Sequence, residues 1–254
     1  MKSPIQESIN NFCSLKTLKK IIPKGSVVSS FLFFDGKQEL SLSEDKRIVI
    51  AHTNKYTIYE FWYCAMRDPT RIALMAEELF KDLRDENLFA LLQENWHTYK
   101  DPYIRSALFF LLNRCSENGL ISAGKLDDKR YNPISLSYLK KFKMDNFHIK
   151  WDQQDDFVKT FGDIKNTDYL LFPIGKFNYN LFEYGKNKGY EMTTIHHKRF
   201  YEALQDVKDK WIVLYKNHPH VHILYKEHNI IMLDKYGREI KDKEKCEEMV
   251  IANF

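Results

Sequence analysis

The chain has 254 residues, of which 44% are hydrophobic and 15% aromatic, so it can bury a large core and is too apolar to be disordered as a whole. Its formal charge of +4 is mild and does not by itself require a nucleic-acid partner. No apolar run approaches the roughly 18 residues of a membrane span, and residues 1–12 lack the apolar segment of a signal peptide. We therefore expect an intracellular protein that is neither secreted nor inserted into a membrane.

The cysteines are widely spaced and include no CxxC pair. This spacing favours reduced thiols over disulfides or a zinc site. They are Cys13, Cys64, Cys115 and Cys246.

The amino-terminal part predicts alternating strands and helices. Apolar residues at helical spacing predict a short helix over residues 10–22, which ends at Pro23. β-Branched and aromatic runs predict buried strands at residues 27–34 and 46–52, and helical periodicity returns at 54–66. A strand, a crossover, a second strand and a helix are the typical opening of a parallel α/β sheet.

A block with helical spacing follows. Asp68-Pro69 and Asp101-Pro102 each place a capping aspartate before a proline suited to a first helical turn. Apolar positions predict helices within residues 70–97, with a break near 85–87, and again at 104–112. From there to residue 150 the chain is polar and basic. We interpret residues 55–150 as a helical and basic insertion in a single domain of residues 1–254.

The last third returns to strands. Apolar runs at 147–151 and 169–172 flank a helix-like segment at 153–161, and residues 197–207 predict another helix. The sequence thus predicts an α/β fold with a mostly parallel sheet and a late antiparallel hairpin. The remaining predicted strands are residues 211–215, 229–233 and 248–251.

Residues 168–184, DYLLFPIGKFNYNLFEY, contain an apolar run that stops at Pro173-Ile174-Gly175 and continues into a segment rich in Tyr and Asn. A buried strand that opens into a loop at its carboxyl end is where open α/β sheets bind their ligands. We therefore expect the functional site of the chain at this corner.

Short patches recur along the chain in a fixed order: SLK at 14–16, LFFDGKQ at 32–38, AHTN at 51–54, ALFFLLNRCSENG at 107–119, YNPI at 131–134, FPIG at 172–175 and EEMVIANF at 247–254. This order resembles that of the Dam-like (D12) class of N6-adenine DNA methyltransferases. That class carries Gly-x-Lys, Glu-Pro-Phe-x-Gly-x-Gly, Asn/Ala-Asp-x-Asn and Asp-Pro-Pro-Tyr at the corresponding places. The resemblance covers nearly the whole chain and implies a Rossmann-like class I methyltransferase fold.

The resemblance also implies which positions would hold S-adenosylmethionine, and several of them depart from the family. The aspartate that binds the cofactor ribose is His52 here, the second loop glycine is Gln38, and the leading acidic residue is Leu32. We expect no cofactor, and S-adenosylmethionine only if the protein is active. The vestigial cofactor positions are Lys16, Phe34, Gly36, His52 and Asn54.

The catalytic motif departs as well. Methylation of an adenine amino group needs a polar acceptor for the N6 hydrogens and an aromatic ring to stack the extruded base. The family's Asp and Tyr supply these groups, but this chain has Phe172 and Gly175 there. We interpret Phe172, Pro173, Ile174 and Gly175 as a vestigial motif and expect no catalytic residue.

Residues 114–150 concentrate the basic excess of the chain, with eight basic and four acidic residues. The resemblance places the family's target-recognition region here, so double-stranded DNA is a candidate partner. The alternative is a solvated insertion with ordinary surface lysines. The candidate DNA contacts are Arg114, Asn118, Lys125, Lys129, Arg130, Asn132, Lys140, Lys141 and Lys143.

Two other patterns are interpreted as structural. Three histidines at residues 218, 220 and 222 would share one face of a strand, but they lack cysteine or acidic partners at ligand spacing, so no metal site is expected. A second set of rings could stack bases, although packing is favoured. These rings are Phe177, Tyr179, Phe182 and Tyr184.

Three functions remain open. The first is an inactive Dam-like protein that binds DNA or another protein, for instance in a virus or mobile element, where it would be intracellular or associated with the virion. The second is an active N6-adenine DNA methyltransferase in which Asp168, Asn178 or Asn180 replaces the missing polar group. The third is an assembly protein without nucleic acid. An open cleft between Phe34 and Phe172 would favour the enzyme, and a filled one would argue against it.

Overall fold

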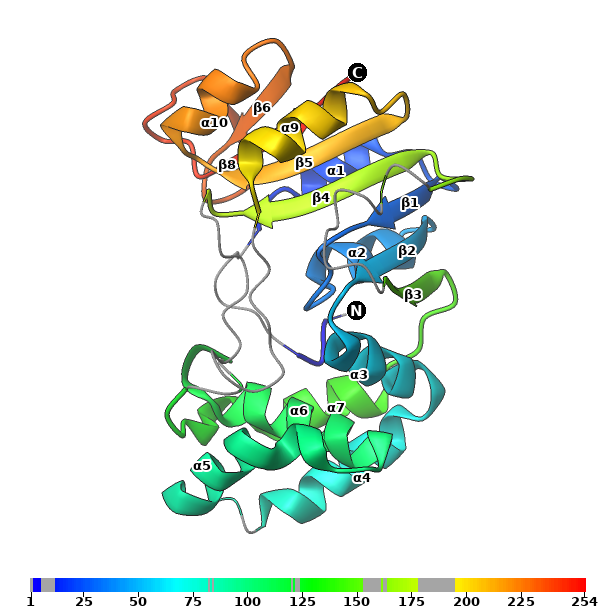
Figure 1. Ribbon diagram of the computed structural model, residues 1–254, viewed down its shortest axis with the longest axis vertical. Helices are drawn as coiled ribbons and strands as arrows, with labels where there is room; N and C mark the ends of the chain where they lie inside the picture. Colours follow the sequence, from blue (N-terminus) through cyan, green and yellow to red (C-terminus); the bar gives the residue numbers. More distant parts are fainter. Residues whose placement is uncertain are drawn as a thin grey trace.

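The computed structural model describes residues 2–5, 12–81, 83, 85–119, 121, 124–152, 161, 164–177 and 195–254. A twisted sheet with helices on both faces lies at one end of the molecule, and a group of helices lies at the other (Figure 1). The fold is therefore α/β, as predicted.

The sheet has eight described strands, and its central part is parallel. The first five strands in the order pair in parallel with their neighbours. The strand β8 pairs antiparallel with both β5 and β6, and β7 extends the edge beside β6. In spatial order the strands are β3 (Phe147–Trp151), β2 (Ile48–Thr53), β1 (Val27–Ser30), β4 (Tyr169–Gly175), β5 (Lys210–Lys216), β8 (Glu248–Ala252), β6 (Asn229–Leu233) and β7 (Glu239–Ile240).

Strand β1 ends earlier than its apolar run predicts. The run continues to Phe34, but Leu32 has a φ of 56°, in the left-handed region that interrupts a strand. Pairing nevertheless persists around this bend, because the N–H of Phe31 donates to Leu171 at 2.9 Å and the N–H of Phe33 donates to His52 at 3.1 Å. The bend thus turns the chain while its rings stay in the core.

Helices cover both faces of the sheet. In Figure 1, α9 (His197–Gln205) and α10 (Pro219–Leu224) lie in front, and α1 (Leu15–Ile21) and α2 (Lys37–Glu44) lie behind. The sequence did not predict α2, which begins at Gly36 with a left-handed φ of 70°. Its residues Gln38 and Glu39 are buried, and because both are polar, the segment lacks the apolar spacing from which a packed helix is predicted.

The second group of helices begins with α3 (Tyr56–Arg67). Both Asp-Pro predictions are confirmed: Asp68 accepts the N–H of Arg71 at 2.9 Å, and Asp101 accepts that of Tyr103 at 2.7 Å. The residues 147–151, counted at first with the insertion, form β3 of the main sheet. The other helices of the group are α4 (Pro69–Phe80), α5 (Glu86–Asn95), α6 (Pro102–Cys115) and α7 (Pro133–Lys140), with 3-10 turns η1 (Trp96–Thr98), η2 (Glu117–Gly119) and η3 (Asp128–Arg130).

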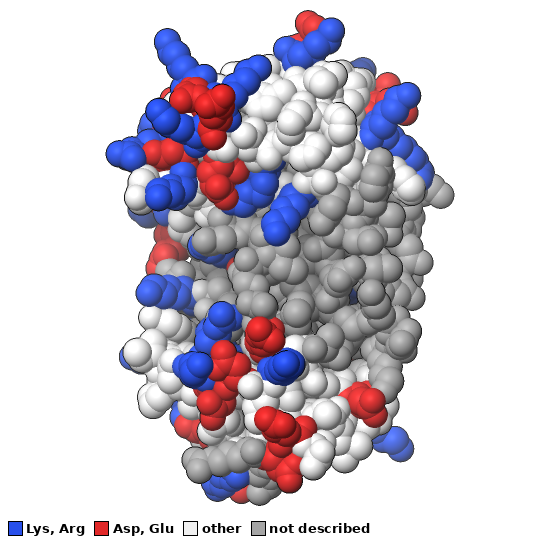
Figure 2. All heavy atoms as spheres, turned by 90° about the vertical axis from the view of Figure 1, so that its left-hand side faces the viewer, with Lys and Arg blue, Asp and Glu red and all other residues white. Residues whose placement is uncertain are grey.

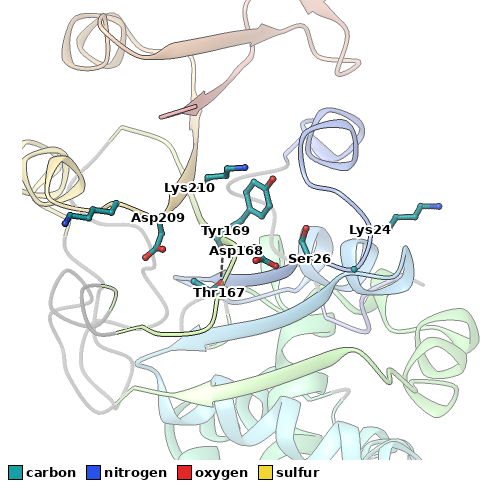
Figure 3. Close-up of a pocket in the computed structure, with 9 residues that line it drawn as sticks. Lys24, Ser26, Thr167, Asp168, Tyr169, Asp209 and Lys210 are labelled. Atoms are coloured by element: carbon teal, nitrogen blue, oxygen red, sulfur yellow. Dashed lines mark hydrogen bonds between the residues drawn. The ribbon is translucent and has the colours of Figure 1, made fainter.

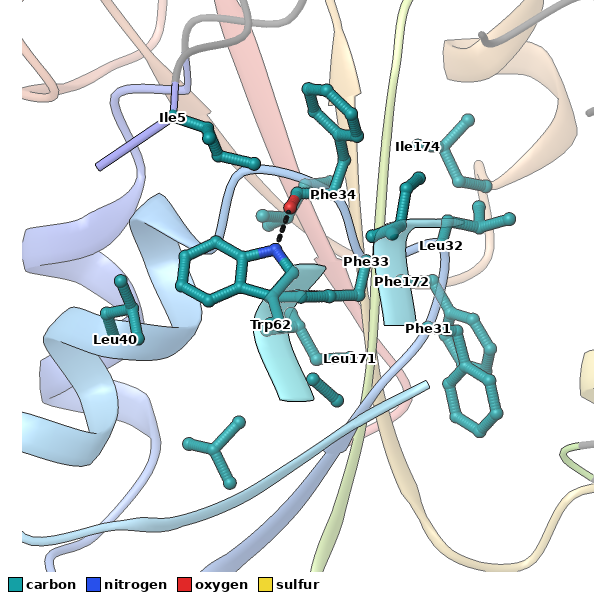
Figure 4. Packing of buried hydrophobic residues seen from close by; sticks show 14 of the residues in the cluster. Ile5, Phe31, Leu32, Phe33, Phe34, Leu40, Trp62, Leu171, Phe172 and Ile174 are labelled. Carbon is teal, nitrogen blue, oxygen red and sulfur yellow. Dashed lines mark hydrogen bonds between the residues drawn. The ribbon is translucent and has the colours of Figure 1, made fainter. Parts of the chain in front are cut away.

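The core joins the two groups through aromatic side chains. The indole of Trp62 on α3 donates to the carbonyl of Phe34 at 2.8 Å, and its ring packs against Phe33 (Figure 4). Ile5 from the amino-terminal segment is buried in the same cluster. Among the described helices, none combines the length and apolarity needed to cross a membrane.

Candidate functional site at the carboxyl ends of the parallel strands

The strand order reverses between β1 and β4, since β1 continues to β2 on one side and the chain returns to β4 on the other. In open α/β sheets, the crevice outside the carboxyl ends at such a point is the usual ligand site. The register aligns side chains of three strands there. Ser30 pairs with both Ala51 and Leu171, so the next position brings Phe31, His52 and Phe172 into one row.

Aromatic rings are stacked along this row. The ring centroids of Phe31 and His52 are 4.8 Å apart with planes inclined by 17°, and those of Phe31 and Phe172 are 4.9 Å apart at 14°. Phe161 and Phe200 each meet Phe172 edge-on at 5.1 Å. All five side chains are buried. Such offset and edge contacts stabilise an aromatic cluster beyond its area burial, so this part of the corner is filled by protein.

His52 is held by a partner that the sequence analysis missed. Its Nδ1 lies 3.0 Å from Oδ2 of Asp152, the first residue after β3. An ionised carboxylate only accepts, so the proton of a neutral ring resides on Nδ1 and the lone pair on Nε2. That Nε2 is buried without a hydrogen-bond partner among the described residues. The one signal in sequence was that Asp152 directly follows a predicted strand.

The loop between β1 and α2 holds further buried polar groups. A Cβ on Gly36 would lie 3.2 Å from both Leu40 and Phe33, so the loop is closely packed around its glycine. Gln38 is buried, and neither polar atom of its amide has a hydrogen-bond partner in the described part of the chain. Glu39 accepts a hydrogen bond from the Ser30 hydroxyl at 2.6 Å, and burial raises the pKa of its carboxyl to about 7.

The remaining cofactor positions differ in their exposure. Lys16 is exposed on α1, and Asn54 is half-buried just after β2. Phe34 is buried and contacts Phe109 of α6 at 6.3 Å between ring centroids. Of the five positions, Lys16 is therefore the exposed one, and Phe34, Gly36 and His52 are buried.

The four residues that the resemblance predicts to be a vestigial motif are part of the sheet itself. Phe172, Pro173, Ile174 and Gly175 are all buried in β4, and the pairing with β5 shifts between Pro173 and Gly175. Gly175 has a φ of 79°, a conformation that favours glycine over the tyrosine of the family. The motif therefore presents neither a hydrogen-bonding group nor a ring to a base.

The structure places Asp168 at the other end of β4 from the Pro173–Gly175 segment. Its carboxylate accepts the N–H of Val27 at 2.8 Å, at the amino ends of β4 and β1. The four residues from Asp168 to Phe172 separate it from the corner by roughly 13 Å. Asn178 and Asn180, and the rings Tyr179, Phe182 and Tyr184, lie outside the described residues.

Three of the candidate DNA contacts have structural partners. Arg114 is largely buried, and its guanidinium donates to the carbonyl of Pro4 at 2.8 Å; burial lowers its pKa to about 10. Asn132 accepts the N–H of Ser135 at 3.0 Å as the cap of α7. Lys140 forms an ion pair of 2.9 Å with Glu77 on α4. These side chains stabilise the helical group.

Most of the other candidate DNA contacts are more accessible to solvent. Lys125, Lys129, Lys141 and Lys143 are exposed and Arg130 is half-buried, whereas the side chain of Asn118 lies outside the described residues. On the face drawn in Figure 2, both basic and acidic side chains of the described residues gather at the two ends of the molecule. The charge of that face is therefore mixed.

Two of the pockets lined by described residues lie away from the corner, and the larger of these two lies at the amino ends of the parallel strands. It has a volume of about 610 Å³ and is lined by the amino ends of β1, β4 and β5, including Ser26, Asp168 and Lys210 (Figure 3). The smaller, of about 370 Å³, lies beside α10 and is lined by Ile223 and His222. Neither pocket lies between Phe34 and Phe172.

The histidines lie on a helix rather than on a strand, because Pro219 begins α10 directly after His218. His222 instead pairs with Asn217 at 2.9 Å. The ring of Phe177 is stacked between His197 at 4.2 Å and His218 at 4.6 Å, as the packing interpretation predicts. Within the described ranges, no three His, Cys, Asp or Glu residues are placed to hold a metal ion.

The geometry thus brings His52 together with Phe172 through the ring of Phe31. Phe31 and Asp152, which the sequence did not single out, complete the corner. No protein-family model and no curated protein matches this sequence, so the chemistry of the corner is inferred from its geometry.

Proposed function

We propose that this protein is a catalytically inactive relative of the Dam-like adenine DNA methyltransferases and acts by binding DNA or a partner protein. The strand order β3-β2-β1-β4-β5, followed by an antiparallel last strand, is consistent with a class I methyltransferase sheet. The pattern alone is shared with other doubly wound folds, so the proposal also depends on the ordered sequence patches.

The observation that carries the proposal is the aromatic row of His52, Phe31 and Phe172 across β2, β1 and β4. Adenine methylation needs an acceptor where Phe172 now packs against hydrocarbon. The loss of one such polar contact typically costs about 3–4 kcal/mol of transition-state stabilisation. The loss of the whole set leaves no route for methyl transfer through these residues.

The residues of the cofactor positions fit S-adenosylmethionine poorly. His52 is committed to Asp152 and stacked on Phe31, and Gln38 puts a side chain where the family has glycine. The chain therefore offers different groups at the two places where the family holds the cofactor ribose and admits its close approach.

Calorimetry with S-adenosylmethionine tests the inactive assignment, and we expect no heat of binding. A titration with duplex DNA at two salt concentrations tests the partner, because phosphate contacts make binding weaken with salt. Reversal of the exposed Lys141 and Lys143 to Glu should abolish duplex binding, and the matched control Lys235→Glu should leave it unchanged. Duplex binding that survives the double reversal excludes this surface, and no duplex binding at all points to the assembly role.

One observation favours the second candidate, an active N6-adenine methyltransferase. The buried Nε2 of His52 has no partner among the described residues, and its lone pair could accept a ribose hydroxyl in place of the family's aspartate. A heat of binding that His52→Phe abolishes, together with methyl transfer to duplex DNA, would establish this alternative and overturn the inactive assignment.

A further inference from the structure

The amino-terminal segment of the chain, residues 2–5, is seated between the sheet and the helical group. Figure 1 shows the amino-terminal end of the chain between these two parts of the molecule. Pro4 is buried, and Ile5 is 2% exposed. Ile5 belongs to the same core cluster as Phe34 and Trp62 (Figure 4). The contacts that hold residues 2–5 therefore define a groove that accepts a short peptide segment.

The guanidinium of Arg114, at the end of α6, holds the backbone of this segment. Its Nε donates to the carbonyl of Pro4 at 2.8 Å, and its Nη2 donates to the same carbonyl and to that of Ser3 at 3.4 Å. Proline has no N–H group, so its backbone offers an acceptor alone to a guanidinium that only donates. Arg114 is largely buried, and without the segment its charge would lose these acceptors. The groove therefore favours an extended peptide backbone that contains proline.

Two side chains fix the register of the segment in the groove. Ile5 enters the core, and Nζ of Lys2 lies 5.8 Å from the centre of the Tyr138 ring on α7, within the range of a cation–π contact. The groove is built by residues far from the segment in sequence, since Arg114 and Pro4 are 110 positions apart. The same contacts would form if the segment came from a second molecule.

We infer that residues 2–5 exchange between two copies of the chain and that the groove is a dimerisation site. The occupant is a second copy because the peptide seen to fit the groove is the chain's own segment. Reciprocal exchange fills both grooves, closes with two-fold symmetry and needs no new kind of contact. Within one molecule, residues 6–11 tether the segment at an effective concentration of millimolar order. The natural protein is therefore a monomer at micromolar concentration and exchanges segments as it approaches millimolar concentration. The inference does not depend on DNA binding.

Complementation between two variants tests the inference. Ile5→Asp spoils the segment and leaves its groove empty, and Arg114→Ala spoils the groove and frees its segment. In analytical ultracentrifugation near millimolar concentration, each variant alone should be a monomer, and an equimolar mixture should form a dimer with one copy of each. The matched control mixes Ile5→Asp with the double variant Ile5→Asp, Arg114→Ala, which offers neither segment nor groove, and should stay monomeric. A monomeric first mixture with natural circular dichroism spectra, or a dimer in the control mixture, would overturn the inference.

A synthetic peptide of residues 1–7, MKSPIQE, gives a second test on the natural protein. Added in excess, it should dissociate the dimer that the natural protein forms near millimolar concentration, because it occupies the same groove. The same peptide with Ile5→Asp should have no effect, since it would bury a charge. A natural dimer that the peptide leaves intact, or a natural protein that stays monomeric up to millimolar concentration, would contradict the exchange. The Lys141→Glu, Lys143→Glu protein should exchange normally, which separates this inference from the proposed duplex binding.

Discussion

Glu39 is a carboxyl group enclosed entirely by protein between α2 and β1. Burial disfavours its charged form and raises its pKa from an ordinary value of 4.5 to about 7, even though the Ser30 hydroxyl donates to it. Because of this raised pKa, the carboxyl group keeps its proton to a higher pH in the folded protein than in the unfolded chain. It therefore couples the stability of the sheet to pH.

The direction of that coupling gives a prediction. Below pH 4.5 the Glu39 carboxyl is protonated in both the folded and the unfolded state, so it does not change the free energy of unfolding. Between pH 4.5 and about 7 it ionises in the unfolded chain but not in the folded protein, so stability falls as pH rises. The Glu39→Gln protein should escape this loss, and its free energy of unfolding should gain roughly 3 kcal/mol on the natural protein between pH 4 and pH 8. Urea unfolding at several pH values measures the difference. Parallel curves for the two proteins would show that Glu39 ionises freely in the fold.

At the residue scale, the sequence showed where the chain departs from the motifs it resembles, but not which contacts its own residues make. The absence of an acceptor at Phe172 and of a carboxylate at His52 is visible in the printed chain. The partner of His52 is Asp152, which lies 100 positions away in sequence, and the ring beneath both Phe172 and His52 is Phe31. Such contacts arise only from the register of three strands.

At the scale of elements, α3 and α6 are joined by a buried ion pair. Nε of Arg105 donates to Glu60 at 2.6 Å, and the Arg105 side chain also contacts the carbonyl of Lys100 at 2.9 Å. Both charged groups are largely removed from solvent. Removal of one partner from such a pair leaves an uncompensated charge in the protein.

We therefore expect Glu60→Ala to lower the free energy of unfolding by about 3–5 kcal/mol. A matched control is Lys140→Ala, which breaks the half-exposed pair with Glu77 between α4 and α7 and should cost at most about 1 kcal/mol. Thermal and urea unfolding compare the two. Similar losses in both proteins would mean that burial does not distinguish the pairs.

Most elements could be predicted because their patterns are local. The Asp-Pro caps of α4 and α6 and the apolar runs of β4 and β5 carry their own signals. Other features could not be predicted: α2 buries Gln38 and Glu39, which appear as surface residues in sequence, and β1 is shortened by the left-handed Leu32. α10 was missed because a histidine-rich run follows Pro219 with no clear period.

At the scale of the whole molecule, Glu248 joins the first helix to the last strand. Its buried carboxylate accepts the N–H groups of Cys13 at 2.6 Å and Ser14 at 3.2 Å, where α1 begins, and lies 3.7 Å from Lys216. Burial and this carboxylate together raise the pKa of the Cys13 thiol to about 12, so the thiol stays protonated and unreactive.

Replacement of this carboxylate should destabilise the entire fold. Glu248→Ala leaves two buried N–H groups without acceptors, and we expect a loss of about 3 kcal/mol in the free energy of unfolding. The neighbouring Glu247→Ala removes a half-exposed partner of the same Lys216 and should cost less than about 1 kcal/mol. Calorimetric unfolding of both proteins tests the contrast. If the stability of the Glu248→Ala protein is unchanged, water must accept the hydrogen bonds of the N–H groups at the start of α1.

The interior position of β8 has a consequence for biosynthesis. Residues 248–252 follow β5 and β6 in the chain, yet they separate these two strands in the sheet. Until they leave the ribosome, β5 and β6 each present an open hydrogen-bonding edge of the kind that recruits strands from other chains. Nascent copies paused just upstream of β8 should therefore depend on chaperones. The sheet cannot close between β5 and β6 until residues 248–252 have left the ribosome tunnel.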